Sequence, residues 1–174
     1  MALAVKKNWT IWETLLWAED YLASYDVPDA KTEAEYLLAY VLDCKRMELH
    51  LNHASHLSYH ILQEFINFVE RRIKREPSQY ILGEQEFWGL GFKVARDVLI
   101  PRPETELIIE ETLKLPISHI PHLVILDLCA GSDCIAISLA KAMPDFKIYA
   151  ADISEEALAV ARENAERHGV ADCC

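Results

Sequence analysis

The stretch LDLCAGSDCIAISLA, residues 126–140, combines an apolar run, a tight turn and the start of a helix. This order is typical of a strand–loop–helix unit that binds a nucleotide where the strand ends. The turn contains a single glycine, Gly131, and Cys129 and Asp133 stand where further glycines are expected. The stretch therefore predicts a cofactor-binding loop but leaves the kind of cofactor open.

The pattern on both sides of this loop alternates between strands and helices. An apolar run at 123–128 precedes a helix predicted over 133–142, and a second run at 147–151 precedes a helix over 154–168 that Gly169 ends. This βαβα order predicts an α/β fold, the first half of a doubly wound, Rossmann-like parallel sheet. Because the first strand of such a sheet is central, 123–128 would present an apolar edge in the absence of its later neighbours.

Residues 1–76 are predicted to form an all-helical N-terminal bundle domain. Thr10 and Glu13 form a T-x-x-E capping box, and Ser58 is placed to cap a longer helix that ends before Pro77. From residue 79, QYILGEQEFWGLGFKVA mixes aromatic and β-branched residues with three glycines, which favours a β-hairpin over a helix. We therefore expect a hairpin linker at 77–100, followed by a partial α/β domain at 101–174.

A carboxylate ends each of the two predicted parallel strands. Asp127 closes the first strand, and Asp152 closes the second, 21 residues after Gly131. An acidic residue about twenty positions beyond the glycine turn usually holds the ribose diol of a nucleotide cofactor. Ser154 is placed to cap the next helix, which leaves Asp152 with no evident structural duty. For Asp127 the structural alternative is a cap on the turn that follows the strand.

The loop residues alone do not choose between cofactors. A dinucleotide pattern requires glycine at 129, 131 and 134, a methyl-donor pattern requires it at 129, 131 and 133, and each finds only Gly131. Carboxylates at 127 and 133 would repel a pyrophosphate, whereas a sulfonium donor that bears an amino group tolerates them, which favours S-adenosylmethionine. Helix capping is the alternative role for Ser132 and Asp133. The predicted cofactor contacts are Asp127, Cys129, Ala130, Gly131, Ser132, Asp133 and Asp152.

Composition limits the classes of partner. The 174 residues include 28 acidic and 17 basic side chains, a formal net charge of −11, so we expect no direct nucleic-acid binding and no membrane association. The apolar N-terminal stretch is too short for a secretory signal, which predicts a cytoplasmic protein. The five cysteines lack metal-ligand spacing, so no metal site is predicted.

Three stretches together resemble the release-factor glutamine methyltransferases, the HemK-type enzymes. They are QYILGEQEFWGLGFKVARDVLIPRPETE, ILDLCAGSDCIAISLAK and IYAADISEEALAVARENAERHGV. The resemblance implies methylation of the side-chain amide of a glutamine in peptide chain release factors, with S-adenosylmethionine as the donor. It also implies a helical N-terminal domain that helps to recognise the release factor, and donor contacts at 129–133 and Asp152.

The family's Asn-Pro-Pro-Tyr motif, which grips the substrate amide, does not occur in residues 1–174. An amide nitrogen is a poor nucleophile, so the enzyme must hold both of its N–H groups and aim it at the methyl group. We therefore interpret the sequence as the N-terminal portion of such an enzyme, with its catalytic residues unassigned and the 174 residues alone expected to be inactive. Two alternatives stay open, a DNA adenine-type amino-methyltransferase and a non-catalytic binding module that retains the helical domain.

Overall fold

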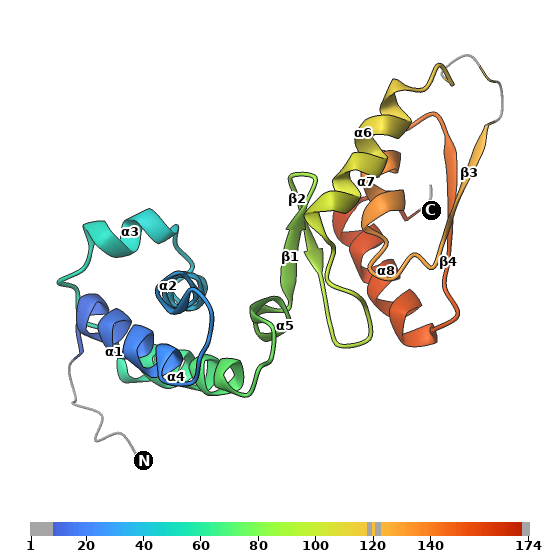
Figure 1. Ribbon diagram of the computed structural model, residues 1–174. Helices are drawn as coiled ribbons and strands as arrows, with labels where there is room; N and C mark the ends of the chain where they lie inside the picture. The colour runs from blue at the N-terminus through green and yellow to red at the C-terminus, as the bar shows by residue number, and fades with distance from the viewer. Residues whose placement is uncertain (1–8, 118–119, 121–122, 172–174) are drawn as a thin grey trace. The chain divides into compact units, whose positions relative to one another are not determined.

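The computed structural model describes residues 9–117, 120 and 123–171. The chain forms two compact units, Met1–Leu82 and Gly83–Cys174 (Figure 1). The first unit extends beyond residue 76, where the sequence analysis placed the end of the helical domain. Within the described ranges, no helix has both the length and the apolar character needed to cross a membrane.

The first unit consists of helices. They are α1 (Ile11–Ala23), α2 (Ala30–Val41), α3 (Arg46–Leu51), α4 (Tyr59–Ile73) and α5 (Ser78–Leu82). Helix α2 packs against both α1 and α4, around a core that includes Leu22, Leu37 and Phe65. The predicted caps are confirmed, because Thr10 and Glu13 form a reciprocal capping box and the Ser58 hydroxyl accepts from the amide of Ile61.

Residues 78–82 form a helix. The prediction that the hairpin already includes the residues from 79 onward is therefore wrong. Pro77 precedes α5, and its carbonyl accepts the amides of Tyr80 and Ile81. The Arg71 guanidinium also donates to the carbonyls of these two residues, at 3.2 and 3.3 Å. Ile81 and Leu82 are buried in the core of the first unit. Burial of these apolar side chains outweighs the β-propensity of the local sequence.

The hairpin follows α5, from which only Gly83 separates it. Strands β1 (Glu84–Phe87) and β2 (Leu90–Lys93) are antiparallel, with Phe87 opposite Leu90. Trp88 and Gly89 form the two-residue turn, and both have positive φ, as a type I′ hairpin requires. The Glu106 carboxylate accepts the Trp88 amide at 2.9 Å and so fixes this turn to the start of the next helix.

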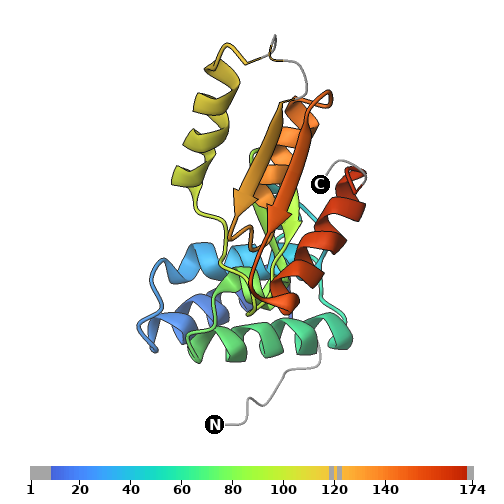
Figure 2. The ribbon, with the colours of Figure 1, turned by 90° about the vertical axis from the view of Figure 1, so that its right-hand side faces the viewer.

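The rest of the second unit confirms the predicted βαβα order. After a short 3-10 turn, η1 (Pro103–Thr105), come α6 (Glu106–Lys114), β3 (Val124–Leu128), α7 (Cys134–Ala142), β4 (Lys147–Ala151) and α8 (Glu155–His168). Strands β3 and β4 are parallel, and Leu128 lies opposite Ala151, so both strands end at the same edge. Helices α6, α7 and α8 lie on one side of this two-stranded sheet (Figures 1 and 2). The fold is thus a helical domain followed by part of a Rossmann-like sheet.

Candidate cofactor site

The loop after β3 is bound to the end of β4. The amides of Cys129 and Ala130 both donate to the carbonyl of Ala151, at 2.8 and 3.1 Å. The amide of Gly131 donates to the Asp152 carboxylate at 2.9 Å. The structure therefore brings the predicted loop into direct contact with Asp152, the residue predicted to bind the ribose. This contact lies at the carboxyl ends of two neighbouring parallel strands, where open α/β sheets bind their ligands.

Asp152 has a structural duty that the sequence analysis did not anticipate. One carboxylate oxygen accepts the Ser154 amide at 3.0 Å, and the other accepts the amide of Gly131. Both hydrogen bonds favour the ionised form and lower the pKa of Asp152 below 3.8. Each carboxylate oxygen has a second lone pair, so hydrogen bonds from two ribose hydroxyls remain compatible with these contacts.

The loop keeps the backbone conformation of a glycine-rich turn although only one glycine is present. Cys129, Gly131 and Asp133 all lie in the left-handed region, with φ of 64°, 57° and 66°. These are the positions at which a methyl-donor pattern has glycine, which reaches this region without a steric penalty. The Cβ atoms of Cys129 and Asp133 make the same backbone less favourable, by about 1–2 kcal/mol per residue at most and least for aspartate.

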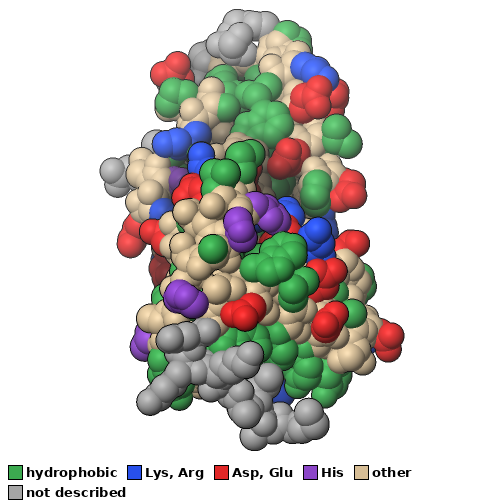
Figure 3. Space-filling view, turned by 90° about the vertical axis from the view of Figure 1, so that its left-hand side faces the viewer, with side chains coloured by type: hydrophobic (Ala, Val, Ile, Leu, Met, Phe, Trp, Pro, Cys, Tyr) green, Lys and Arg blue, Asp and Glu red, His purple; other side chains and the backbone are tan. Residues whose placement is uncertain are grey.

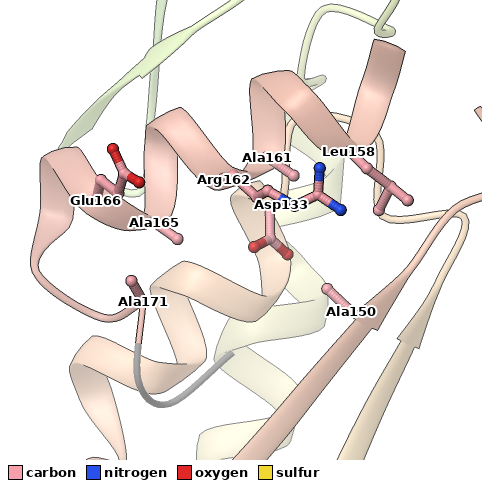
Figure 4. Close-up of a pocket in the computed structure, with 8 residues that line it drawn as sticks. All are labelled: Asp133, Ala150, Leu158, Ala161, Arg162, Ala165, Glu166 and Ala171. Carbon is pink, nitrogen blue, oxygen red and sulfur yellow. The ribbon is translucent and has the colours of Figure 1, made fainter. Parts of the chain in front are cut away.

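Asp133 is buried and its carboxylate lacks a full set of partners. Its exposed fraction is 2%, and its side chain makes no capping hydrogen bond to α7. Among the described atoms, one oxygen of Asp133 and one of Asp127 are buried without a hydrogen-bond partner. Burial, and then the charge of Asp127, raise the pKa of Asp133 to about 7. The side chain of Asp133 borders a groove between α8 and β4 (Figure 4).

Asn164 on α8 is a structural residue of this site that the sequence analysis missed. Its fully buried amide donates to the carbonyls of Ser132 and Lys93, at 2.9 and 3.0 Å, and its oxygen accepts the Lys93 amide at 2.7 Å. It therefore joins the loop, the hairpin and α8. The available signal was its position, because Asn164 falls on the otherwise apolar face of α8, beside Ala161 and Ala165.

The available groups at this edge suit a cationic ligand with hydroxyl donors. The unpartnered oxygens of Asp127 and Asp133 are acceptors in a largely buried setting, and the amides of Cys129, Ala130 and Gly131 already donate within the protein. A pyrophosphate would meet carboxylates and few available amides, whereas an ammonium group and a ribose diol would meet acceptors. The residues present therefore fit S-adenosylmethionine better than a dinucleotide.

Each of the two units matches a known family model. Residues 13–83 match the family model described as the PrmC N-terminal domain, and residues 120–174 match a methyltransferase domain. The chain is therefore similar to a helical PrmC-type domain followed by part of a methyltransferase domain.

The sequence relatives specify this class further, because they carry the name release factor glutamine methyltransferase. That of Geobacter sulfurreducens is 45% identical over 162 residues, which are 92% of this chain and 56% of the relative. That of Chlorobaculum tepidum is 40% identical over 173 residues, 96% of this chain and 58% of the relative. The predicted resemblance to release-factor glutamine methyltransferases is thus confirmed, and the chain spans little more than half the length of these relatives.

Proposed function

We propose that this chain binds S-adenosylmethionine at the end of β3 and β4, as part of an enzyme that methylates a glutamine side chain in peptide chain release factors. The observation that supports this most directly is the contact between the Gly131 amide and the Asp152 carboxylate. It assembles a loop and an acid from two consecutive strands, in a chain whose relatives carry this activity in their names. We place this activity in the cytoplasm, where release factors act.

Within this proposal, each carboxylate has a separate task. Asp152 accepts the ribose hydroxyls, and Asp127 and Asp133 face the positive charge of the donor. The donor supplies an electrophilic methyl group when bound, and the chain's own residues orient it. The Asn164 side chain stabilises this arrangement, because its amide donates to the Ser132 carbonyl and so fixes the second half of the loop.

We assign recognition of the release factor to the helical unit. Its surface carries exposed apolar side chains on α1 and α3, interspersed with histidines (Figure 3). Trp12 and Leu16 lie one turn apart on α1, and Met47 and Leu51 lie at the same spacing on α3. The Trp12 amide donates to the carbonyl of His53, just beyond α3, which holds the two segments side by side. Exposed apolar groups of this kind mark protein-binding surfaces.

The test of donor binding is calorimetric titration of S-adenosylmethionine into the chain and two variants. Asp152→Asn should weaken binding at least tenfold because it removes the charge and one pair of acceptors. Asp145→Asn, an exposed acid in the turn before β4, is the matched control and should bind as the wild type does. Equal affinity for wild type and Asp152→Asn would refute the assignment of the site.

Transfer is tested separately, by incubating the chain with labelled donor and a purified release factor and locating any methylated glutamine by mass spectrometry. A methylated glutamine that requires Asp152 supports the enzymatic proposal. Transfer by these 174 residues would exclude the non-catalytic alternative, whereas donor binding without transfer is the outcome expected of residues 1–174, in which the Asn-Pro-Pro-Tyr motif does not occur. The titration thus tests the assignment of the binding site, and the transfer assay tests the proposed reaction.

A further inference from the structure

The helical unit contains a buried carboxylate that takes no part in the donor site. Glu35 lies on α2, and its side chain is only 6% exposed. One of its oxygens accepts a guanidinium N–H of Arg46 at 2.5 Å, and the other lies 3.4 Å from Nε2 of His50. Both partners belong to α3 (Figure 1). A buried carboxylate is strongly unfavourable unless it is paired, so the burial of Glu35 and the position of α3 depend on each other.

Helix α3 has few other contacts that fix its orientation. It contains six residues, and helices shorter than about 12 residues are marginal in isolation. All six lie within the described part of the chain, and among them only Leu49 is buried. The side chain of Lys45, which precedes the helix, makes no capping hydrogen bond to it. A single apolar anchor leaves α3 free to turn about that point, and the two contacts with Glu35 remove this freedom.

The residues of α3 that contact Glu35 stand directly beside the apolar residues that α3 exposes. Arg46 and His50 are four positions apart and therefore share one face of the helix. Met47 and Leu51 each follow one residue later, about 100° further around the helix, and both are 74% exposed. The orientation that Glu35 imposes on α3 therefore determines where Met47 and Leu51 point.

We propose that Glu35 is a positioning residue for release-factor recognition, because its buried carboxylate holds α3 in the orientation that presents Met47 and Leu51. The inference rests on the proposed assignment of recognition to the helical unit. It goes further because Glu35 is itself buried and contacts no partner protein. A surface that is already held in its bound orientation loses less conformational entropy on association and so binds more tightly.

The two members of the ion pair differ in exposure, which predicts how their variants differ. The Arg46 side chain is 48% exposed, against 6% for Glu35. Loss of the carboxylate therefore leaves a guanidinium in contact with water, whereas loss of the guanidinium leaves a buried charge without its main partner. Glu35→Gln should consequently weaken recognition in the wild-type chain but restore part of it in an Arg46→Met chain. A residue that only fills space in the core would not show this reversal.

The test measures the affinity of the full chain for a purified release factor by biolayer interferometry, and the hydrogen exchange of peptides that cover α3. Glu35→Gln should lower the affinity and accelerate the exchange by about tenfold each, with the helical circular dichroism of the wild type because glutamine has the size of glutamate. Arg46→Met should lower the affinity at least as far, and the double variant should bind more tightly than Arg46→Met alone. Glu64→Gln, which removes an exposed acid from α4, is the matched control and should behave as the wild type does.

Several results would overturn this inference while leaving the proposed function intact. They are wild-type affinity for Glu35→Gln, unchanged exchange of α3, and a double variant that binds no better than Arg46→Met. Loss of helical circular dichroism in Glu35→Gln would assign Glu35 to the stability of the whole helical unit and would overturn the inference as well. A wild-type chain that does not bind the release factor would instead refute the proposed recognition, and the role of Glu35 would fall with it.

Discussion

Asp133→Asn should remove a pH-dependent loss of stability from the second unit. Burial raises the pKa of Asp133 from 3.8 to about 7, so the folded protein retains a proton that the unfolded chain releases. The free energy of unfolding therefore falls as the pH rises from about 4 and levels off above about 7. At about 1.4 kcal/mol per pKa unit, this loss amounts to up to about 4 kcal/mol. The asparagine variant has no such proton, so it should be the more stable protein at pH 8 and similar to wild type at pH 4.

The measurement must report on the second unit alone. Urea titrations followed by hydrogen exchange on peptides from α7 and β4 meet this need, at pH 4, 6 and 8. Asp145→Asn is the control, since it removes an exposed carboxylate from the same unit and should retain the wild-type pH profile. Parallel profiles for wild type and Asp133→Asn would show that Asp133 titrates normally, and the account of its burial would then be wrong.

Three further outcomes are expected. Asn164→Ala should lower the free energy of unfolding by about 2–4 kcal/mol in urea titration, because it leaves three backbone partners unsatisfied. Cys129→Gly should raise it by about 1 kcal/mol, since it relieves a left-handed conformation. A fragment of residues 1–82 should unfold cooperatively and at a higher temperature by calorimetry than one of residues 1–76, which lacks the buried Ile81 and Leu82.

Local patterns in the sequence are sufficient for most of the second unit. Strand β4 occupies the predicted range 147–151, and α8 ends at Gly169 in the left-handed conformation expected of a helix terminus. Helix α5 escaped the same reasoning because QYIL has the composition of a strand. Its conformation depends on Arg71 and on the helical core, and both lie outside the window that a local pattern samples.

The roles of the site residues also divide into those that the sequence predicts and those that depend on contacts between distant residues. The acids at both strand ends and the loop between them are readable from spacing, since a parallel sheet brings consecutive strand ends to one edge. The double duty of Asp152 and the buried state of Asp133 are not readable in this way. They depend on which amides lie within hydrogen-bond distance and on the position of α8, which only the folded chain defines.

The loop retains its shape without its glycines because contacts from outside the loop determine its backbone. Left-handed φ at Cys129 and Asp133 costs about 2–4 kcal/mol in total at most. Two amide bonds to the Ala151 carbonyl and the bond from the Gly131 amide to the Asp152 carboxylate oppose this cost. The contacts with β4 and Asp152 therefore offset the strain, and the two substitutions change the energy of the loop more than its geometry. Asp133→Gly should nevertheless bind S-adenosylmethionine more weakly than wild type in the same calorimetric titration, because it removes a carboxylate that faces the positive charge of the donor. An unchanged affinity would show that the Asp133 side chain does not influence the donor.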